Sequence, residues 1–236
     1  MEKKYKLTAE TINVDGRTLY RIEALKDFND VKKGDKGGFV EKEDNLSQSD
    51  NCWVYGNAKV HDNAKVFDNA EVRINAHVYG DTLVYDNAQI YGKAAVHDDA
   101  VVCDNAIVCD NAEVYEDAKV LDFAEVYGDA KVYGYAKVYD TAKVYDDAQV
   151  YGDAAVCGET RICGDAAVCA DSDYILFKNW WSSGRFFTWT KSNNMWKVGC
   201  FYGTGEQLIE KAYKDSEVSG REYERVVKYV EAIMRE

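Results

Sequence analysis

Residues 126–155 read VYGDAK VYGYAK VYDTAK VYDDAQ VYGDAA, five near-copies of one six-residue unit. Outward from this stretch, an aliphatic residue recurs every six positions without a break, from Val54 to Val168. A small residue, most often alanine, lies two positions before each of these aliphatic residues. Twenty units in one register mark the segment as a repeat array, and the fold must follow from stacking its units.

The order of residue types within a unit predicts a short strand followed by a corner. In a strand, alanine and the valine two positions later face one side, while lysine and tyrosine face the other. The Gly, Asp and Asn residues that follow tolerate the left-handed conformation that turns a chain. An α-helix would rotate successive valines by about 120°, so no helix face could collect them. Since one unit cannot bury its own apolar face, neighbouring units must stack into a β-solenoid.

The hexads resemble those of left-handed β-helix hexapeptide-repeat proteins, in which three hexads make one triangular coil. The resemblance implies a mainly β fold, a left-handed parallel β-helix of about 6–7 coils at ~3 hexads each. It also implies a homotrimer. The flanking segments look similar to uncharacterised hexapeptide-repeat proteins of phage and prophage genomes, which implies no defined activity. These segments are LYRIEALKDF (19–28), GDKGGFVEKEDNLS (34–47) and VGCFYGT (198–204).

Changes in pattern divide the chain into three parts. Residues 1–45 are expected to form an N-terminal β-hairpin cap, since INVDGRTLYRI (12–22) alternates apolar and polar residues around Asp15-Gly16. Residues 46–171 form the β-helix. Residues 172–236 are expected to form a small α+β domain in the order β-β-β-α-α. Its strands are predicted at 174–180, 185–190 and 195–201, and its helices at 205–214 and 220–235.

Composition limits the setting of the protein. The chain has no proline, which suits strands whose every backbone N–H is needed for pairing. Five of the seven cysteines occupy one equivalent repeat position, so reduced side chains are expected rather than disulfides. No apolar run approaches the ~18 residues of a membrane span, and the N-terminal residues lack the apolar stretch of a signal peptide. We therefore expect a cytoplasmic protein that binds no membrane.

Negative charge is concentrated on the repeat. Residues 46–173 hold 9 Lys and Arg against 24 Asp and Glu, a net charge of −15 in a chain of net charge −13. The triangular coil would stack five aspartates at one corner, Asp68, Asp86, Asp104, Asp122 and Asp140. One hypothesis is that this acidic corner column presents a DNA-like field to a basic host protein. The alternative is that aspartates turn the chain and keep the rod soluble. Direct binding of nucleic acid is not expected.

One face of the predicted prism is less polar than the others. It carries Phe67, Leu83, Tyr85, Val101, Cys103 and Leu121. We call this set the apolar face, and we expect it to contact another subunit or a terminal helix.

Histidine and cysteine are the candidates for chemistry, because many hexapeptide-repeat proteins are acyltransferases that use a histidine base. Three hexads per coil place His61, His77 and His97 on one face, with His61 and His97 in one column about 9.6 Å apart. That spacing is too wide for a shared metal, whose ligands lie ~2.0–2.1 Å from the ion, so no metal is predicted. Asp62 or Asp98 could orient a catalytic histidine, although each histidine could also merely replace an outward tyrosine. Cys200 lacks a basic partner and is interpreted as structural.

Three functions remain open. The favoured hypothesis is a non-enzymatic interaction or scaffold protein, plausibly phage-encoded, that binds or inhibits a host protein and needs no cofactor. The second is a hexapeptide-repeat acyltransferase that uses acetyl-CoA, which rests on fold analogy. The third is a small-ligand binding protein that uses clefts between subunits or the aromatic C-terminal domain.

Overall fold

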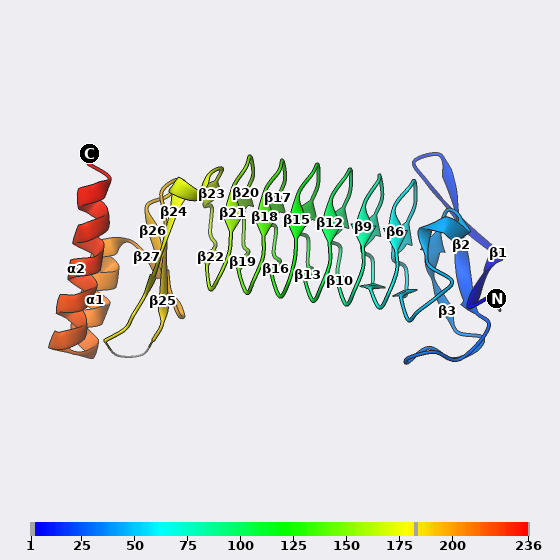
Figure 1. Ribbon diagram of the computed structural model, residues 1–236, viewed down its shortest axis with the longest axis horizontal. Coiled ribbons are helices and arrows are strands. Elements are labelled where there is room, and N and C mark those ends of the chain that lie inside the picture. The colour runs from blue at the N-terminus through cyan, green and yellow to red at the C-terminus, as the bar shows by residue number, and fades with distance from the viewer. Residues whose placement is uncertain (1–2, 182–183, 236) are drawn as a thin grey trace.

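The computed structural model describes residues 3–181 and 184–235 and shows an elongated molecule in three parts (Figure 1). A small β structure lies at the N-terminal end, a β-solenoid forms the middle, and a sheet with two helices lies at the C-terminal end. The two chain ends therefore lie at opposite ends of the rod. The predicted mainly β solenoid fold with a C-terminal α+β part is confirmed.

The N-terminal part is built on the predicted hairpin. Strands β1 (Tyr5–Val14) and β2 (Arg17–Ala24) pair antiparallel around Asp15 and Gly16, both of which have positive φ. Strand β3 (Lys36–Val40) pairs antiparallel with β2 and parallel with β5 of the solenoid. A 3-10 turn, η1 (Glu43–Asn45), leads into the first coil. The hairpin thus joins the solenoid as a continuation of one of its sheets.

The solenoid consists of two-residue strands, one for each hexad. Their bounds are β4 (Trp53–Val54), β5 (Lys59–Val60), β6 (Lys65–Val66), β7 (Glu71–Val72), β8 (His77–Val78), β9 (Leu83–Val84), β10 (Gln89–Ile90), β11 (Ala95–Val96), β12 (Val101–Val102), β13 (Ile107–Val108), β14 (Glu113–Val114), β15 (Lys119–Val120), β16 (Glu125–Val126), β17 (Lys131–Val132), β18 (Lys137–Val138), β19 (Lys143–Val144), β20 (Gln149–Val150), β21 (Ala155–Val156), β22 (Arg161–Ile162) and β23 (Ala167–Val168).

Every third strand belongs to the same parallel sheet, so the coil has three sides. The first sheet runs β1-β2-β3-β5-β8-β11-β14-β17-β20-β23, the second β22-β19-β16-β13-β10-β7-β4 and the third β21-β18-β15-β12-β9-β6. Equivalent residues pair eighteen positions apart, as Lys131 does with Gln149. The three-hexad coil expected from the family resemblance is therefore present. The left-handed sense stays a prediction.

The interior of the solenoid is filled by the aliphatic and small residues that recur every six positions. The repeated valines, isoleucines and alanines are almost completely buried and form one continuous core. Thr82 and Thr160 replace alanine, and each buried hydroxyl donates to a backbone carbonyl three residues earlier at 2.6 Å. Because a buried hydroxyl without a partner would cost about 1–3 kcal/mol, these bonds make the exceptions tolerable.

The C-terminal part has one more strand than predicted. Its sheet contains β24 (Tyr174–Lys178), β25 (Phe186–Thr190), β26 (Met195–Val198) and β27 (Phe201–Gly203), preceded by the 3-10 turn η2 (Asp171–Asp173). The β-β-β-α-α prediction is wrong at 195–201, because Gly199 has a φ of +55° and folds that segment into a tight hairpin. Helices α1 (Gly205–Asp215) and α2 (Glu217–Ile233) follow near their predicted positions and pack on the sheet.

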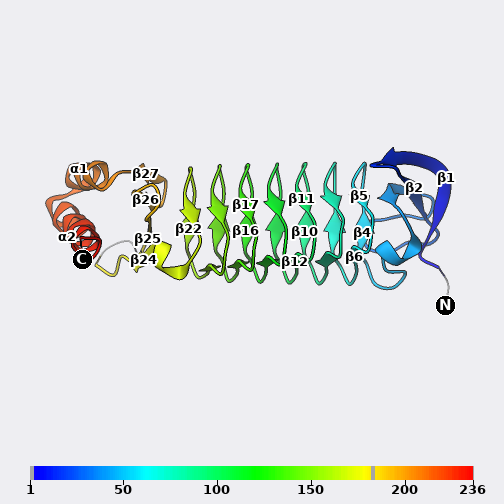
Figure 2. The ribbon, with the colours of Figure 1, turned by 90° about the horizontal axis from the view of Figure 1, so that it is seen from above.

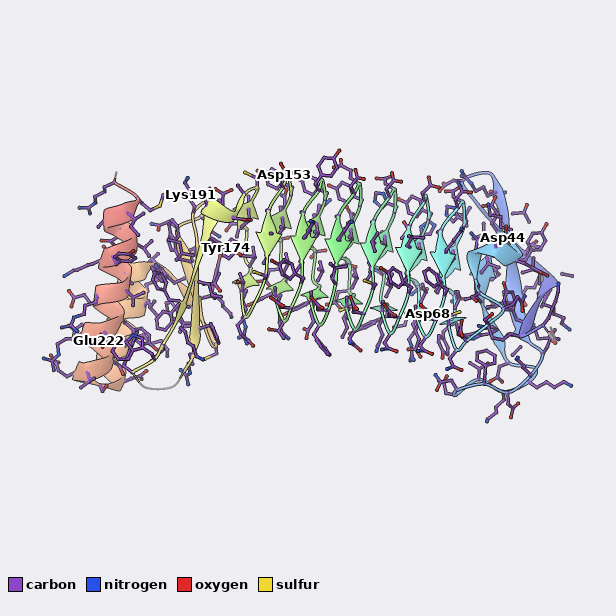
Figure 3. The ribbon with its side chains drawn as sticks, in the orientation of Figure 1. Asp44, Asp68, Asp153, Tyr174, Lys191 and Glu222 are labelled. Carbon is purple, nitrogen blue, oxygen red and sulfur yellow. The ribbon has the colours of Figure 1, made fainter. Side chains whose placement is uncertain are left out.

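The C-terminal sheet closes the last coil. Side-chain oxygens accept one backbone N–H from each of its three strands: Asp171 from Ala155, Thr188 from Arg161 and Ser192 from Ala167, at 2.8–3.0 Å. The Tyr174 hydroxyl donates to the Ala155 carbonyl at 2.9 Å, where the sheet meets the solenoid (Figure 3). An open last coil would expose unpaired strand groups, so these contacts protect the end of the rod from pairing with another chain.

Candidate functional site

The three histidines lie on the sheet that the N-terminal hairpin extends. His61 begins a column of stacked rings that continues through Tyr79, His97, Tyr115, Tyr133 and Tyr151, with ring centroids 4.8–5.2 Å apart. His77 lies in the neighbouring column, where Lys59 precedes it by one coil and Ala95 follows it. The structure thus confirms the order of the rings on this face. The small Ala95 side chain leaves one side of the His77 ring without a large neighbour in its column.

His61 and His77 form a direct contact that the sequence did not predict. Their Nε2 atoms lie 2.6 Å apart, and the side chain of His61 is only 2% exposed. The Nδ1 atom of His61 lies 3.1 Å from a carboxylate oxygen of Asp62. Asp62, His61 and His77 are therefore linked in a row by two hydrogen bonds. Asp62 and His61 are consecutive residues at a corner, and His77 belongs to the next coil.

The order of acceptors fixes the hydrogen positions along this chain. The carboxylate of Asp62 can only accept at neutral pH, so Nδ1 of His61 carries a hydrogen and Nε2 of His61 is an acceptor. The short contact then requires Nε2 of His77 to donate. The remaining nitrogen of His77, Nδ1, then carries a lone pair, and no donor among residues 3–181 and 184–235 bonds to it. A neutral imidazole nitrogen with a lone pair is the group that general-base catalysis uses, so His77 is the candidate general base.

Burial keeps both histidines neutral. Burial, reinforced by the neighbouring His61, lowers the pKa of His77 to about 4. Burial also lowers the pKa of His61, although Asp62 opposes the shift. At pH 7 His77 is therefore unprotonated, and its lone pair is available to accept a proton. Its low pKa makes it a weak base.

The N-terminal hairpin supplies further charged groups to the histidine pair. The guanidinium of Arg17 lies 2.5 Å from Asp62, and Glu41 accepts the backbone N–H of Asp62 at 2.7 Å. Figure 2 shows the end of β1 next to the first coil, near β5. Both groups bond to Asp62, the residue that follows His61 in the chain. Neither Arg17 nor Glu41 was predicted, because only the folded hairpin brings them to the site.

His97 offers a second, simpler histidine–carboxylate pair. Its Nδ1 atom lies 3.1 Å from Asp98, as anticipated for an orienting carboxylate, and its ring is 20% exposed between Tyr79 and Tyr115. Its Nε2 atom has no hydrogen-bond partner in the described part of the chain. His97 could therefore also accept a proton, without a second histidine behind it.

Two groups of side chains have the donor types of a metal site. Glu41, His61 and Asp62 place ligand atoms within 4.8 Å of one another, and so do Asp86, Cys103 and Asp104. In the first group Arg17 already pairs with Asp62 and would oppose a cation. In the second group burial raises the pKa of the Cys103 thiol to about 11, which disfavours the thiolate that metals prefer. We therefore derive no chemistry through a metal.

The acidic corner column has a structural part in the fold. All five aspartates have φ between 54° and 58°. Asp104 accepts the backbone N–H of Asp122 at 3.2 Å, Asp122 that of Asp140 at 3.1 Å, and Asp140 that of Gly158 at 3.0 Å. Asp68, labelled in Figure 3, similarly faces the backbone N–H of Asp86 at 3.4 Å. The aspartates both turn the chain and join each coil to the next.

The apolar face lies along the third sheet. Leu83 and Val101 stand side by side in its ladder, and the rings of Phe67 and Tyr85 stack 5.0 Å apart. Cys103 is buried, whereas the other members are half-buried. This face and the histidines are therefore on different sides of the prism. Cys200 is exposed in the turn between β26 and β27, away from all three histidines.

Comparison with known proteins supports one of the three functional hypotheses. No model of a known protein family matches the chain. The chain is similar to the uncharacterized acetyltransferase YdcK of Escherichia coli (strain K12), with 39% identity over 61 residues, which are 22% of this chain and 19% of that protein. The match thus spans about a fifth of that relative's length. Neither helix among the described residues is long and apolar enough to cross a membrane.

The similarity corrects the favoured functional prediction. A non-enzymatic scaffold protein that binds a host protein through an acidic rod was wrong, since the matched relative bears the name of an acetyltransferase. The finding fits a β-helix repeat protein and favours the acyltransferase alternative. The predicted relation to phage proteins and the predicted cytoplasmic location stay predictions.

Proposed function

We propose that the protein is an acyltransferase of the hexapeptide-repeat type that transfers an acetyl group from acetyl-CoA. The observation that carries the proposal is the chain Asp62–His61–His77, which leaves Nδ1 of His77 as a free base. The similarity to an acetyltransferase supports the reaction class. A histidine held by a second group is the arrangement that general-base catalysis of acyl transfer requires.

In this reaction, Nδ1 of His77 takes a proton from the hydroxyl or amine of an acceptor. The acceptor then attacks the thioester carbonyl, and the thiolate of coenzyme A leaves and regains a proton. Asp62 holds the His61 ring, and His61 in turn holds the His77 ring, so the base enters the reaction already oriented. Lys59, one coil away in the same column, supplies a positive charge near the developing negative charge.

Assembly as a homotrimer through the apolar face is part of the proposal. Half-buried apolar side chains in one ladder suit a subunit contact, and the family resemblance implies three subunits. Light scattering tests this point, with a trimer expected for the unchanged chain and a smaller species for Val101→Glu. A monomeric unchanged chain would refute the assembly.

A thiol-release assay with acetyl-CoA and a panel of amine and hydroxyl acceptors tests the function. We expect acceptor-dependent release of coenzyme A by the full chain and a decrease of about 10²–10⁴-fold for His77→Gln. His97→Gln should retain most of the activity, and Tyr133→Phe, in the same ring column, serves as the control. Full activity of the His77 variant would exclude His77 as the base. Absence of any acetyl-CoA binding by the unchanged chain would exclude the function.

A further inference from the structure

A separate cavity lies in the C-terminal domain, away from the histidines. Its volume is about 380 Å³, within the range of small-molecule sites. It opens between the end of the sheet, the start of α1 and the last turns of α2. Trp189 and Trp196 line it on the sheet side, and Val227, Val230 and Met234 line it on the side of α2. The cavity therefore has apolar walls on two sides.

One hydrogen-bond donor that lines this cavity has no partner in the described part of the chain. Trp196 is only 2% exposed, and its indole N–H finds no acceptor among residues 3–181 and 184–235. Its Nε1 atom lies next to Gly205, which also lines the cavity. By contrast, the indole N–H of Trp189 donates to the side chain of Asn194 at 2.9 Å. The Nε1 atom of Trp196 is not among the fully enclosed side-chain atoms without a partner, so this N–H is open to the cavity and can donate to a molecule bound there.

The surrounding charges favour an acceptor that is negative. Gly205 is the first residue of α1, an eleven-residue helix whose N-cap residue Thr204 accepts the Gln207 N–H. The other N–H groups of the first turn and the positive end of the helix dipole lie at the cavity. Lys191 and Arg235 stand at its rim, opposed by Glu231. Lys191 lies where the sheet turns, near the junction with the solenoid (Figure 3). Two cations against one carboxylate leave the rim positive.

We propose that this cavity binds a small aromatic carboxylate. The carboxylate accepts the Trp196 N–H near the start of α1, with Lys191 and Arg235 at the entrance, and the aromatic body fills the space between the indoles and α2. The site is distinct from the histidine pair, so it does not depend on acetyl transfer.

Gly205 keeps the carboxylate end of the cavity open. A Cβ at this position would lie 2.6 Å from a methyl group of Val227 and 3.3 Å from Nε1 of Trp196. Only glycine therefore allows α1 to start this close to both side chains while leaving the indole N–H within reach of a ligand.

Calorimetric titration of the full chain with 2-naphthoate, and with uncharged 2-naphthamide as the matched probe, tests the proposal. We expect one naphthoate site per chain and binding of naphthamide at least about tenfold weaker, since a hydrogen bond to a charged group is worth ~1.5–3 kcal/mol. Trp196→Phe keeps the ring and removes the donor, so naphthoate should bind about tenfold more weakly. Lys191→Gln should weaken it by about two- to fivefold, and the distant Lys137→Gln should change nothing.

No naphthoate binding at millimolar concentration, equal binding of the two probes, or unchanged binding by Trp196→Phe would each overturn the proposal. Trp196 is buried, so its variant is first checked for a cooperative unfolding transition. If that variant does not fold, the exposed Lys191 decides the matter. Binding of naphthoate by Lys191→Gln that equals binding by Lys137→Gln, with no response to added salt, would then refute the site.

Discussion

The Nε2 atoms of His61 and His77 lie 2.6 Å apart, although the two residues belong to successive coils and to neighbouring columns. One nitrogen must donate and the other accept, so the two rings cannot both be protonated without breaking the contact. Protonation of both His61 and His77 should therefore lower the stability of the N-terminal coils.

Stability should fall in acid partly through this pair. The pKa of His77 in the folded chain, about 4, lies below the ordinary value of 6.5 that the unfolded chain would show. Between these values the unfolded state binds more protons, so the free energy of unfolding decreases as the pH falls from about 6.5 to 4. His77→Gln should lose less stability over that interval than the unchanged chain does. Urea titrations at pH 7 and pH 4.5 measure the difference, and an equal loss in both proteins would refute this role for His77.

Arg17 should influence the pKa of His61. Its positive charge, beside Asp62, disfavours protonated His61. Arg17→Gln removes that charge, and the pKa of His61 is expected to rise. Titration of the imidazole C–H signals by nuclear magnetic resonance measures it. Lys65→Gln, an exposed change on another sheet, is the control, and an unchanged or lower pKa in the Arg17 variant would contradict the electrostatic account.

The corner aspartates should contribute to stability rather than only to charge. Asp122→Ala places alanine at a φ of +55° and removes the acceptor for the Asp140 N–H. Left-handed backbone costs alanine about 1–2 kcal/mol and the hydrogen bond adds about 1 kcal/mol, so a loss of about 2–3 kcal/mol is expected. Asp122→Asn preserves both the turn and an acceptor, so it should change the free energy of unfolding by less than about 0.5 kcal/mol. Equal stability of the two variants in urea would show that the corner contacts are unimportant.

The closing of the last coil depends on hydroxyl acceptors. Thr188 is buried and accepts the Arg161 N–H at 3.0 Å. Thr188→Val keeps the shape and leaves that amide unsatisfied, which should cost about 1–3 kcal/mol and promote association of rods through their ends. Thr188→Ser retains the acceptor and should remain close to the unchanged chain. Thermal unfolding and sedimentation measure the two effects, and a valine variant as stable and as dispersed as the serine variant would argue against the closing role.

The sequence predicted the solenoid well because its period determines which side chains face inward. It was less informative at Gly199, where one residue with positive φ turned an expected strand into a hairpin. It placed His61, His77 and His97 on one face, yet the contact between His61 and His77 depends on the directions of two side chains in neighbouring columns, which the period does not determine. Arg17 reaches Asp62 only through tertiary folding. Net charge led to the wrong function, because aspartates that turn corners and accept backbone N–H groups are required by the fold itself.

The proposed chemistry depends on which nitrogen of His77 carries the hydrogen. Since the chain has only three histidines, single variants assign every imidazole signal in a long-range nitrogen–proton correlation spectrum at pH 7. The account predicts that His61 is protonated at Nδ1 and His77 at Nε2, with Nδ1 of His77 bare. A His77 ring protonated at Nδ1 would contradict it, because Nδ1 could then not take a proton from the hydroxyl or amine that receives the acetyl group.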